Sequence, residues 1–131
     1  MKIFNNRGSE IITTPIVIAI GIMMISSLIV FSVKLLTPYI WYEKLSSTCL
    51  KYVFIMEEFG YLTNKEKSIL LNELESQGFD TSNITIKCTN KRQNYGSRIY
   101  IKVDYLYKMS LPIVGDRTIP MEISKESVSK V

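Results

Sequence analysis

The chain has 131 residues, with 16 Lys or Arg against 12 Asp or Glu, a formal net charge of +4 and no histidine. Without histidine it lacks the commonest general base and metal ligand, so we expect no enzyme activity, no catalytic or metal site, no cofactor and no small-molecule substrate. The basic residues are spread along the chain, which argues against nucleic acid as a partner.

An apolar segment runs from Ile11 to about Leu36 and carries no charge between Glu10 and Lys34. At 1.5 Å per residue, a helix of this length covers the ~30 Å hydrocarbon core of a bilayer. The segment is longer than the apolar part of a secretory signal, and no A-x-A-like site follows it. We therefore expect a retained single-pass membrane helix over residues 9–37, with the lipid bilayer as its partner. The alternative is a buried helix of a soluble protein.

The end of the apolar segment has the residues of a membrane interface: Lys34, Tyr39, Trp41 and Tyr42. Aromatic rings with one polar end collect where lipid meets water, so these residues form a candidate interfacial belt. Basic residues lie on both sides of the segment and do not decide its orientation. The two cysteines and the larger polar part favour a cytoplasmic N-terminus and an extracytoplasmic head, residues 38–131, at the cell surface.

After the apolar segment, one apolar face continues at helical spacing, through Leu45, Cys49, Tyr52, Val53, Met56 and Phe59. The pattern predicts that the membrane helix continues into the head, that Pro38 kinks it near the membrane surface and that Gly60 ends it.

A capping box of Thr63 and Glu66 predicts the start of a second helix. Its expected core face has the residues Ile69, Leu70, Leu71 and Leu74, and Gly78 is the expected C-terminal cap.

From residue 84 onward the apolar period changes to two, which is typical of half-buried strands. Strands are expected at 84–88 and 99–107, joined by a polar hairpin loop at 89–97. A turn at Gly115-Asp116 precedes a shorter strand at 119–123. The predicted fold class is α+β: a long transmembrane helix continuing into a small domain with a second helix and a three-stranded antiparallel meander.

Cys49 lies on the apolar face of the expected helix, and Cys88 on the apolar face of the first strand. Both sulfurs then point into the interface between sheet and helix, where a disulfide is geometrically allowed. Such a bridge closes a loop of about 40 residues and stabilises the fold by about 3–4 kcal/mol. The alternative is a pair of buried free thiols.

Three sequence segments, in this order, carry a family resemblance: Asn6-Arg7-Gly8-Ser9-Glu10, then residues 78–86, then residues 105–112. They resemble the Arg-Gly stub, the Gly-(apolar)-Asp lead into the first strand, and the strand ending in a Leu-Pro loop of TadE-like pseudopilins. These are pilin-like proteins of tight-adherence (Tad) type IV pilus or secretion systems.

The resemblance implies that residues 1–8 are a leader-like basic stub, cut after Gly8 so that Ser9 becomes the N-terminus. Such pilins usually carry an acidic residue at the fifth position after the cut, where Thr13 stands, whereas Glu10 stands at the second. Glu10 is the candidate assembly carboxylate, since in low dielectric it can pair with the terminal amine of a neighbouring subunit. Alternatively, it is a carboxylate at the membrane surface, favoured there by the helix dipole.

Two functions therefore remain open. The first is a pilin-like structural subunit, a minor pilin or pseudopilin, whose partners are other pilin-like or membrane subunits of the same apparatus. The second is a bitopic, membrane-anchored binding or signalling module with no role in a filament.

Overall fold

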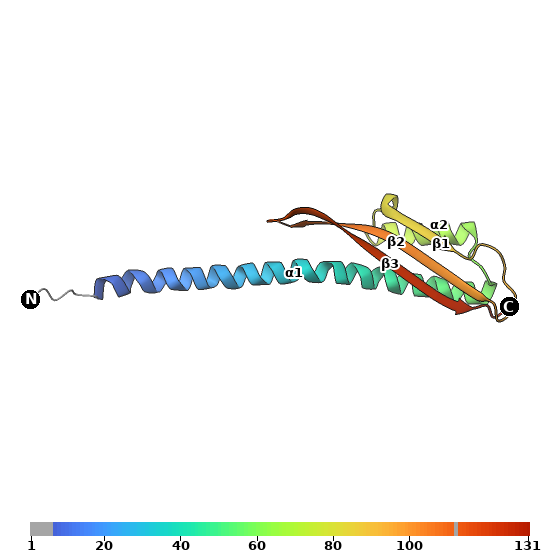
Figure 1. The fold of residues 1–131 in the computed structure, drawn as a ribbon, viewed down its shortest axis with the longest axis horizontal. Coiled ribbons are helices and arrows are strands. Elements are labelled where there is room, and N and C mark those ends of the chain that lie inside the picture. Colours follow the sequence, from blue (N-terminus) through green and yellow to red (C-terminus); the bar gives the residue numbers. More distant parts are fainter. Residues whose placement is uncertain (1–6, 112) are drawn as a thin grey trace, which may run out of the picture. The chain divides into compact units, whose positions relative to one another are not determined.

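The computed structural model describes residues 7–111 and 113–131, and of residues 7–10 the backbone alone. In chain order its elements are α1 (Arg7–Phe59), α2 (Asn64–Ser76), a 3₁₀ turn η1 (Thr81–Asn83), β1 (Ile84–Cys88), β2 (Arg98–Leu111) and β3 (Gly115–Val128). The predicted α+β class is confirmed: a long N-terminal apolar helix, a second helix and a three-stranded antiparallel sheet (Figure 1).

The chain divides into two compact units, one up to Thr37 and the other from Pro38 to Val131, which we call the head. Helix α1 contributes to both, because its bounds run through Pro38 without a break. The last part of α1, residues 38–59, is therefore a component of the head. The kink at Pro38 stays a prediction.

The helices of the head end and begin at the residues that the sequence indicates. Gly60, at φ 78°, follows the last residue of α1 in the left-handed conformation that a glycine adopts without strain. Thr63 caps α2: its hydroxyl accepts from the backbone N–H of Glu66, whose carboxylate accepts from the backbone N–H of Thr63. Gly78, at φ 97°, follows the end of α2.

The sheet has the order β1-β2-β3, with both neighbouring pairs antiparallel. Its register places Ile86 opposite Val103 and Val103 opposite Ile123. The expectation of a short third strand was wrong: β3 has 14 residues, as many as β2, and Gly115 is its first residue. Pro120 is compatible with this longer strand because β3 lies at the edge of the sheet.

The core of the head lies between the sheet and the two helices. Its fully buried side chains come from all of these elements and include Leu45, Met56, Leu70, Leu74, Ile99, Ile101, Val103 and Ile123. Two positions expected on the core face are instead exposed, Phe59 and Ile69. Near the Phe59 end of α1, Ser127 of β3 bonds to Glu57, and Ile69 lies about 100° around α2 from the buried Leu70.

Candidate functional site

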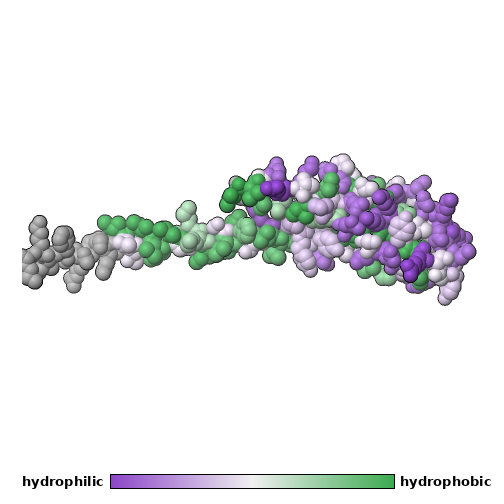
Figure 2. All heavy atoms as spheres, in the orientation of Figure 1, coloured by the Kyte–Doolittle hydropathy of each residue, from purple (hydrophilic) through white to green (hydrophobic). Residues whose placement is uncertain are grey.

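The apolar part of α1 leaves its side chains uncovered within its own unit. An 18-residue window of the helix is long and apolar enough to cross a membrane, and none of that window is buried. Met23, for example, is 75% exposed. Figure 2 shows apolar residues along this helix and mostly hydrophilic residues over the head. Within this chain the apolar window is therefore not a buried core helix, because a core helix would have its apolar side chains covered.

Two polar side chains in or next to this segment bond within the helix. The Ser32 hydroxyl donates to the Leu28 carbonyl at 2.8 Å, and the Thr37 hydroxyl donates to the Val33 carbonyl at 2.9 Å. Such bonds satisfy a hydroxyl where lipid offers no partner.

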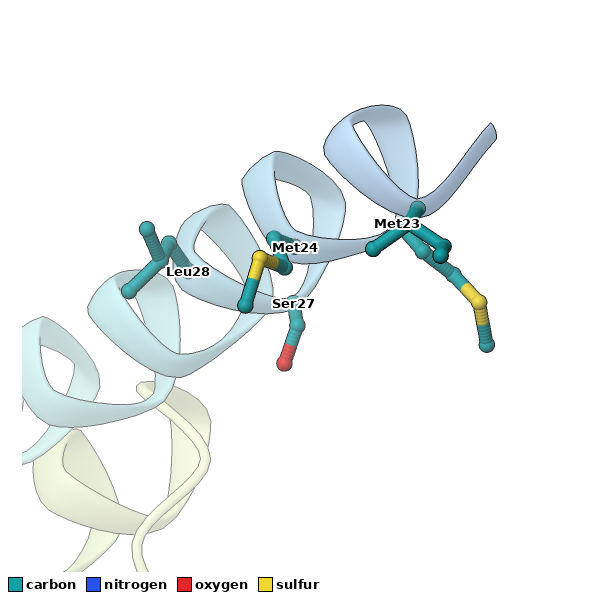
Figure 3. Close-up of a pocket in the computed structure, with 5 residues that line it drawn as sticks. Met23, Met24, Ser27 and Leu28 are labelled. Carbon is teal, nitrogen blue, oxygen red and sulfur yellow. The ribbon is translucent and has the colours of Figure 1, made fainter. Parts of the chain in front are cut away.

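One stretch of the apolar helix has a shallow hollow on its surface, lined by Ile20, Met23, Met24, Ser27 and Leu28. Figure 3 shows the Met23 side chain extended away from the helix, with Met24, Ser27 and Leu28 along the same stretch. Methionine is flexible and adapts to irregular neighbours. The hollow therefore suits lipid chains or another apolar helix and has no charged group for a polar ligand.

The backbone at the predicted cleavage position is helical, since the described part of α1 includes Arg7, Gly8 and Ser9. The side chains of Gly8, Ser9 and Glu10 lie outside the part that the structure describes, as do residues 1–6 of the expected leader. Cleavage after Gly8 and a pairing role for Glu10 therefore stay predictions.

Among the four predicted belt residues, Trp41 has a packing role in the head that the sequence did not reveal. Its ring meets Phe79 edge to face, with centroids 4.8 Å apart and planes at 88°, and lies 6.2 Å from the Tyr107 ring. The Lys44 ammonium stands 5.0 Å from the Trp41 ring centroid. Tyr39 and Tyr42 are exposed and Lys34 is half-buried. The belt itself stays a prediction.

The two cysteines are free thiols in the structure. Cys49 is fully buried in the core, and burial raises its pKa to about 12, against a smaller opposing effect of Lys125. Cys88 is half-buried against the same core, and burial raises its pKa as well, with Lys67 as its charged neighbour. Both thiols are therefore protonated at neutral pH. The disulfide stays a prediction.

A polar cluster that sequence reasoning missed holds the C-terminal strand to the end of α1. Glu57 is buried, accepts a hydrogen bond from the Ser127 hydroxyl and pairs with the Lys130 ammonium. The backbone N–H of Lys130 also donates to the Glu57 carbonyl at 2.9 Å. Lys130 and Ser127 hold the pKa of the Glu57 carboxyl below its ordinary value.

A second carboxylate joins the two head helices. Glu73 of α2 accepts from the Tyr52 hydroxyl at 2.9 Å and pairs with the Lys51 ammonium at 3.1 Å, both from α1. Among the described residues, no His, Cys, Asp and Glu side chains form a group that could hold a metal ion. Glu57 and Glu73 are thus both engaged in structural pairs.

No protein-family model, curated protein or solved structure matches this chain. The fold itself defines a class: a long N-terminal apolar helix followed by an antiparallel sheet is a pilin-like architecture. This topology, with an uncovered apolar helix leading into a head that has its own core, points to a membrane-anchored structural subunit.

Proposed function

We propose that the chain is a TadE-like minor pilin or pseudopilin, a structural subunit of a Tad-type pilus or secretion apparatus. The observation that carries the proposal is the division of α1. Its apolar first part has no buried side chain in the membrane-compatible window, and its last part is a core helix of the head. An apolar helix near an N-terminus acts as an anchor or as a signal segment, and the continuation of α1 past Thr37 into the head favours an anchor.

The head offers further support, because two large apolar residues are exposed on the outer side of α1, among the exposed polar residues Ser47, Lys51 and Glu58. Leu50 and Phe54 are 42% and 56% exposed, and their spacing of four residues places them on one face of the helix. Exposed large apolar residues at this spacing suit packing against another helix. We propose that this face contacts neighbouring subunits of the apparatus and that the protein acts by such contacts, without catalysis.

The proposal includes a direction and a processing step. The N-terminus lies in the cytoplasm, the head lies outside, and cleavage follows Gly8. The cut leaves Ser9 and Glu10 as the first residues of a chain whose backbone is helical at these positions. Glu10 is then close to the new terminal amine, where a carboxylate can pair with a neighbouring subunit.

The test is the N-terminus of the protein extracted from membranes of its own cells, determined by N-terminal sequencing and intact mass. We expect a chain that begins at Ser9. Gly8→Val should keep the longer chain, because a side chain replaces the glycine at the cut. Gly21→Val is the matched control, since an added Cβ at Gly21 meets no atom within 4 Å, and it should be cut normally. A wild-type chain that still begins at Met1, with no assembled form in cross-linking, would favour a lone anchor with a binding or signalling role.

A further inference from the structure

The free end of the β2–β3 hairpin is apolar and has little support from the rest of the sheet. Strand β1 pairs with β2 only as far as Tyr105, so residues 106–111 of β2 pair with β3 alone. We call residues 106–111 and 113–120 the hairpin tip. Ile113 is 96% exposed and Val114 54% exposed. Figure 2 shows an apolar patch at this free end of the hairpin.

Contacts within the head show that the tip lies at the end of the head near Pro38, where the chain enters. At one end of the head, Gly60 accepts a hydrogen bond from the backbone N–H of Gln93, next to the end of α1. At the other end, Tyr107 lies beside Trp41, three residues after the head begins at Pro38. Strand β2 therefore runs towards the end of the head at which the chain enters. The tip continues for four residues from Tyr107 to Leu111, about 13 Å of strand.

That end of the head is also the end at which the chain joins it to the apolar segment. Trp41 follows Leu36, the end of the apolar segment, by five residues, which is about 7.5 Å of helix. The length of the tip beyond Tyr107 is thus greater than the length of chain between Trp41 and Leu36.

The tip has three charged residues, Lys108, Arg117 and Asp116, and its net charge of +1 favours an anionic lipid surface. Lys108 and Arg117 stand on its two strands in adjacent register pairs, Lys108 opposite Thr118 and Met109 opposite Arg117. Their long side chains can lie along apolar groups while the charged ends reach lipid phosphates. Asp116 lies between the apolar turn and Arg117, and the combination of an exposed apolar end with a net positive charge suits a segment that inserts at a membrane interface.

We propose that the hairpin tip inserts into the headgroup region of an anionic bilayer, with Ile113 and Val114 in contact with the acyl chains and Lys108 and Arg117 at the phosphates. The inference rests on the proposed membrane anchor. It gives the head a second attachment to the same membrane, which restrains the rotation of the head about the end of the anchor.

The test places a tryptophan at the tip of the full-length chain and reconstitutes it in vesicles of phosphatidylcholine and phosphatidylglycerol with brominated acyl chains. Ile113→Trp is compared with Tyr95→Trp, which lies at another largely exposed position, in the loop between β1 and β2, where Tyr95 is 80% exposed. Both sites are exposed, so neither substitution disturbs the core, and the wild-type Trp41 signal is subtracted from both.

We expect the tryptophan fluorescence of Ile113→Trp to shift to shorter wavelength in the vesicles and to be quenched by the bromines. Tyr95→Trp should show neither effect. Lys108→Glu combined with Arg117→Glu should reduce the quenching of Ile113→Trp. Equal quenching of the two tryptophans, or a shorter wavelength at Ile113→Trp without quenching, would overturn the proposal, the latter because a protein surface then covers the tip. Flotation of every variant with the vesicles after alkaline washing reports separately whether the anchor itself has inserted.

Discussion

Replacing Gly78 by alanine is expected to destabilise the head through two effects that the structure separates. Gly78 has φ 97°, so any Cβ there costs about 1–2 kcal/mol of backbone strain. The new methyl would also stand 3.1 Å from Cη2 of Trp41, closer than ordinary contact. Crowding of this kind adds about 1 kcal/mol, the lower end of the cost of overpacking. The total loss is about 2–3 kcal/mol.

Gly96→Ala is the matched control. Gly96 also has a positive φ, 77°, but an added Cβ there meets nothing within 4 Å, so only the backbone cost remains. Urea unfolding of the full chain in detergent, followed by far-ultraviolet circular dichroism, measures both losses. A cycle with Trp41→Leu isolates the crowding, because the cost of Gly78→Ala should fall by about 1 kcal/mol when the ring is absent. An unchanged cost in the Trp41→Leu background would refute the packing of Trp41 against the head.

Three further predictions use the same preparation. Thr63→Ala should lower the free energy of unfolding by about 1 kcal/mol through the lost cap, while Ser68→Ala, an exposed site on the same helix, should change it by less than about 0.5 kcal/mol. Because the pKa of Glu57 is lowered in the fold, its stabilisation is present above the ordinary value of 4.5 and is lost as the pH falls below it, so Glu57→Gln should flatten this acid dependence in urea titrations. A maleimide applied without reductant at neutral pH should modify Cys88 before the fully buried Cys49, whereas protection of both thiols until reductant is added would indicate the disulfide.

The parts of the fold that the sequence predicts well depend on signals between near neighbours in the chain. Gly60 and Gly78 end their helices because each position needs a left-handed backbone, and the Thr63 and Glu66 pair forms within one turn. The length of β3 was not predictable in this way. Polar residues 116–118 and Pro120 hide the alternation of a strand, and the strand forms there because β2 offers a continuous partner over 14 positions.

The candidate site likewise has features that depend on near neighbours in the chain and features that depend on distant ones. An uncharged apolar run is enough to predict the exposed helix, because nothing in the rest of the chain is needed to form it. The contacts of Glu57 could not be read from the sequence, since Ser127 lies 70 positions away. Trp41 could be assigned to a membrane belt by its place next to the apolar run, but its packing on Phe79 depends on a turn 38 positions later, which only the folded head reveals.

The central claim is that the apolar part of α1 holds this protein in a lipid bilayer. Alkaline carbonate extraction of membranes from cells that make the full chain tests it most directly. We expect the protein to remain with the membrane pellet, because an uncovered apolar helix of this length is not released when ionic contacts are broken. Release of the folded protein into the supernatant would contradict the account.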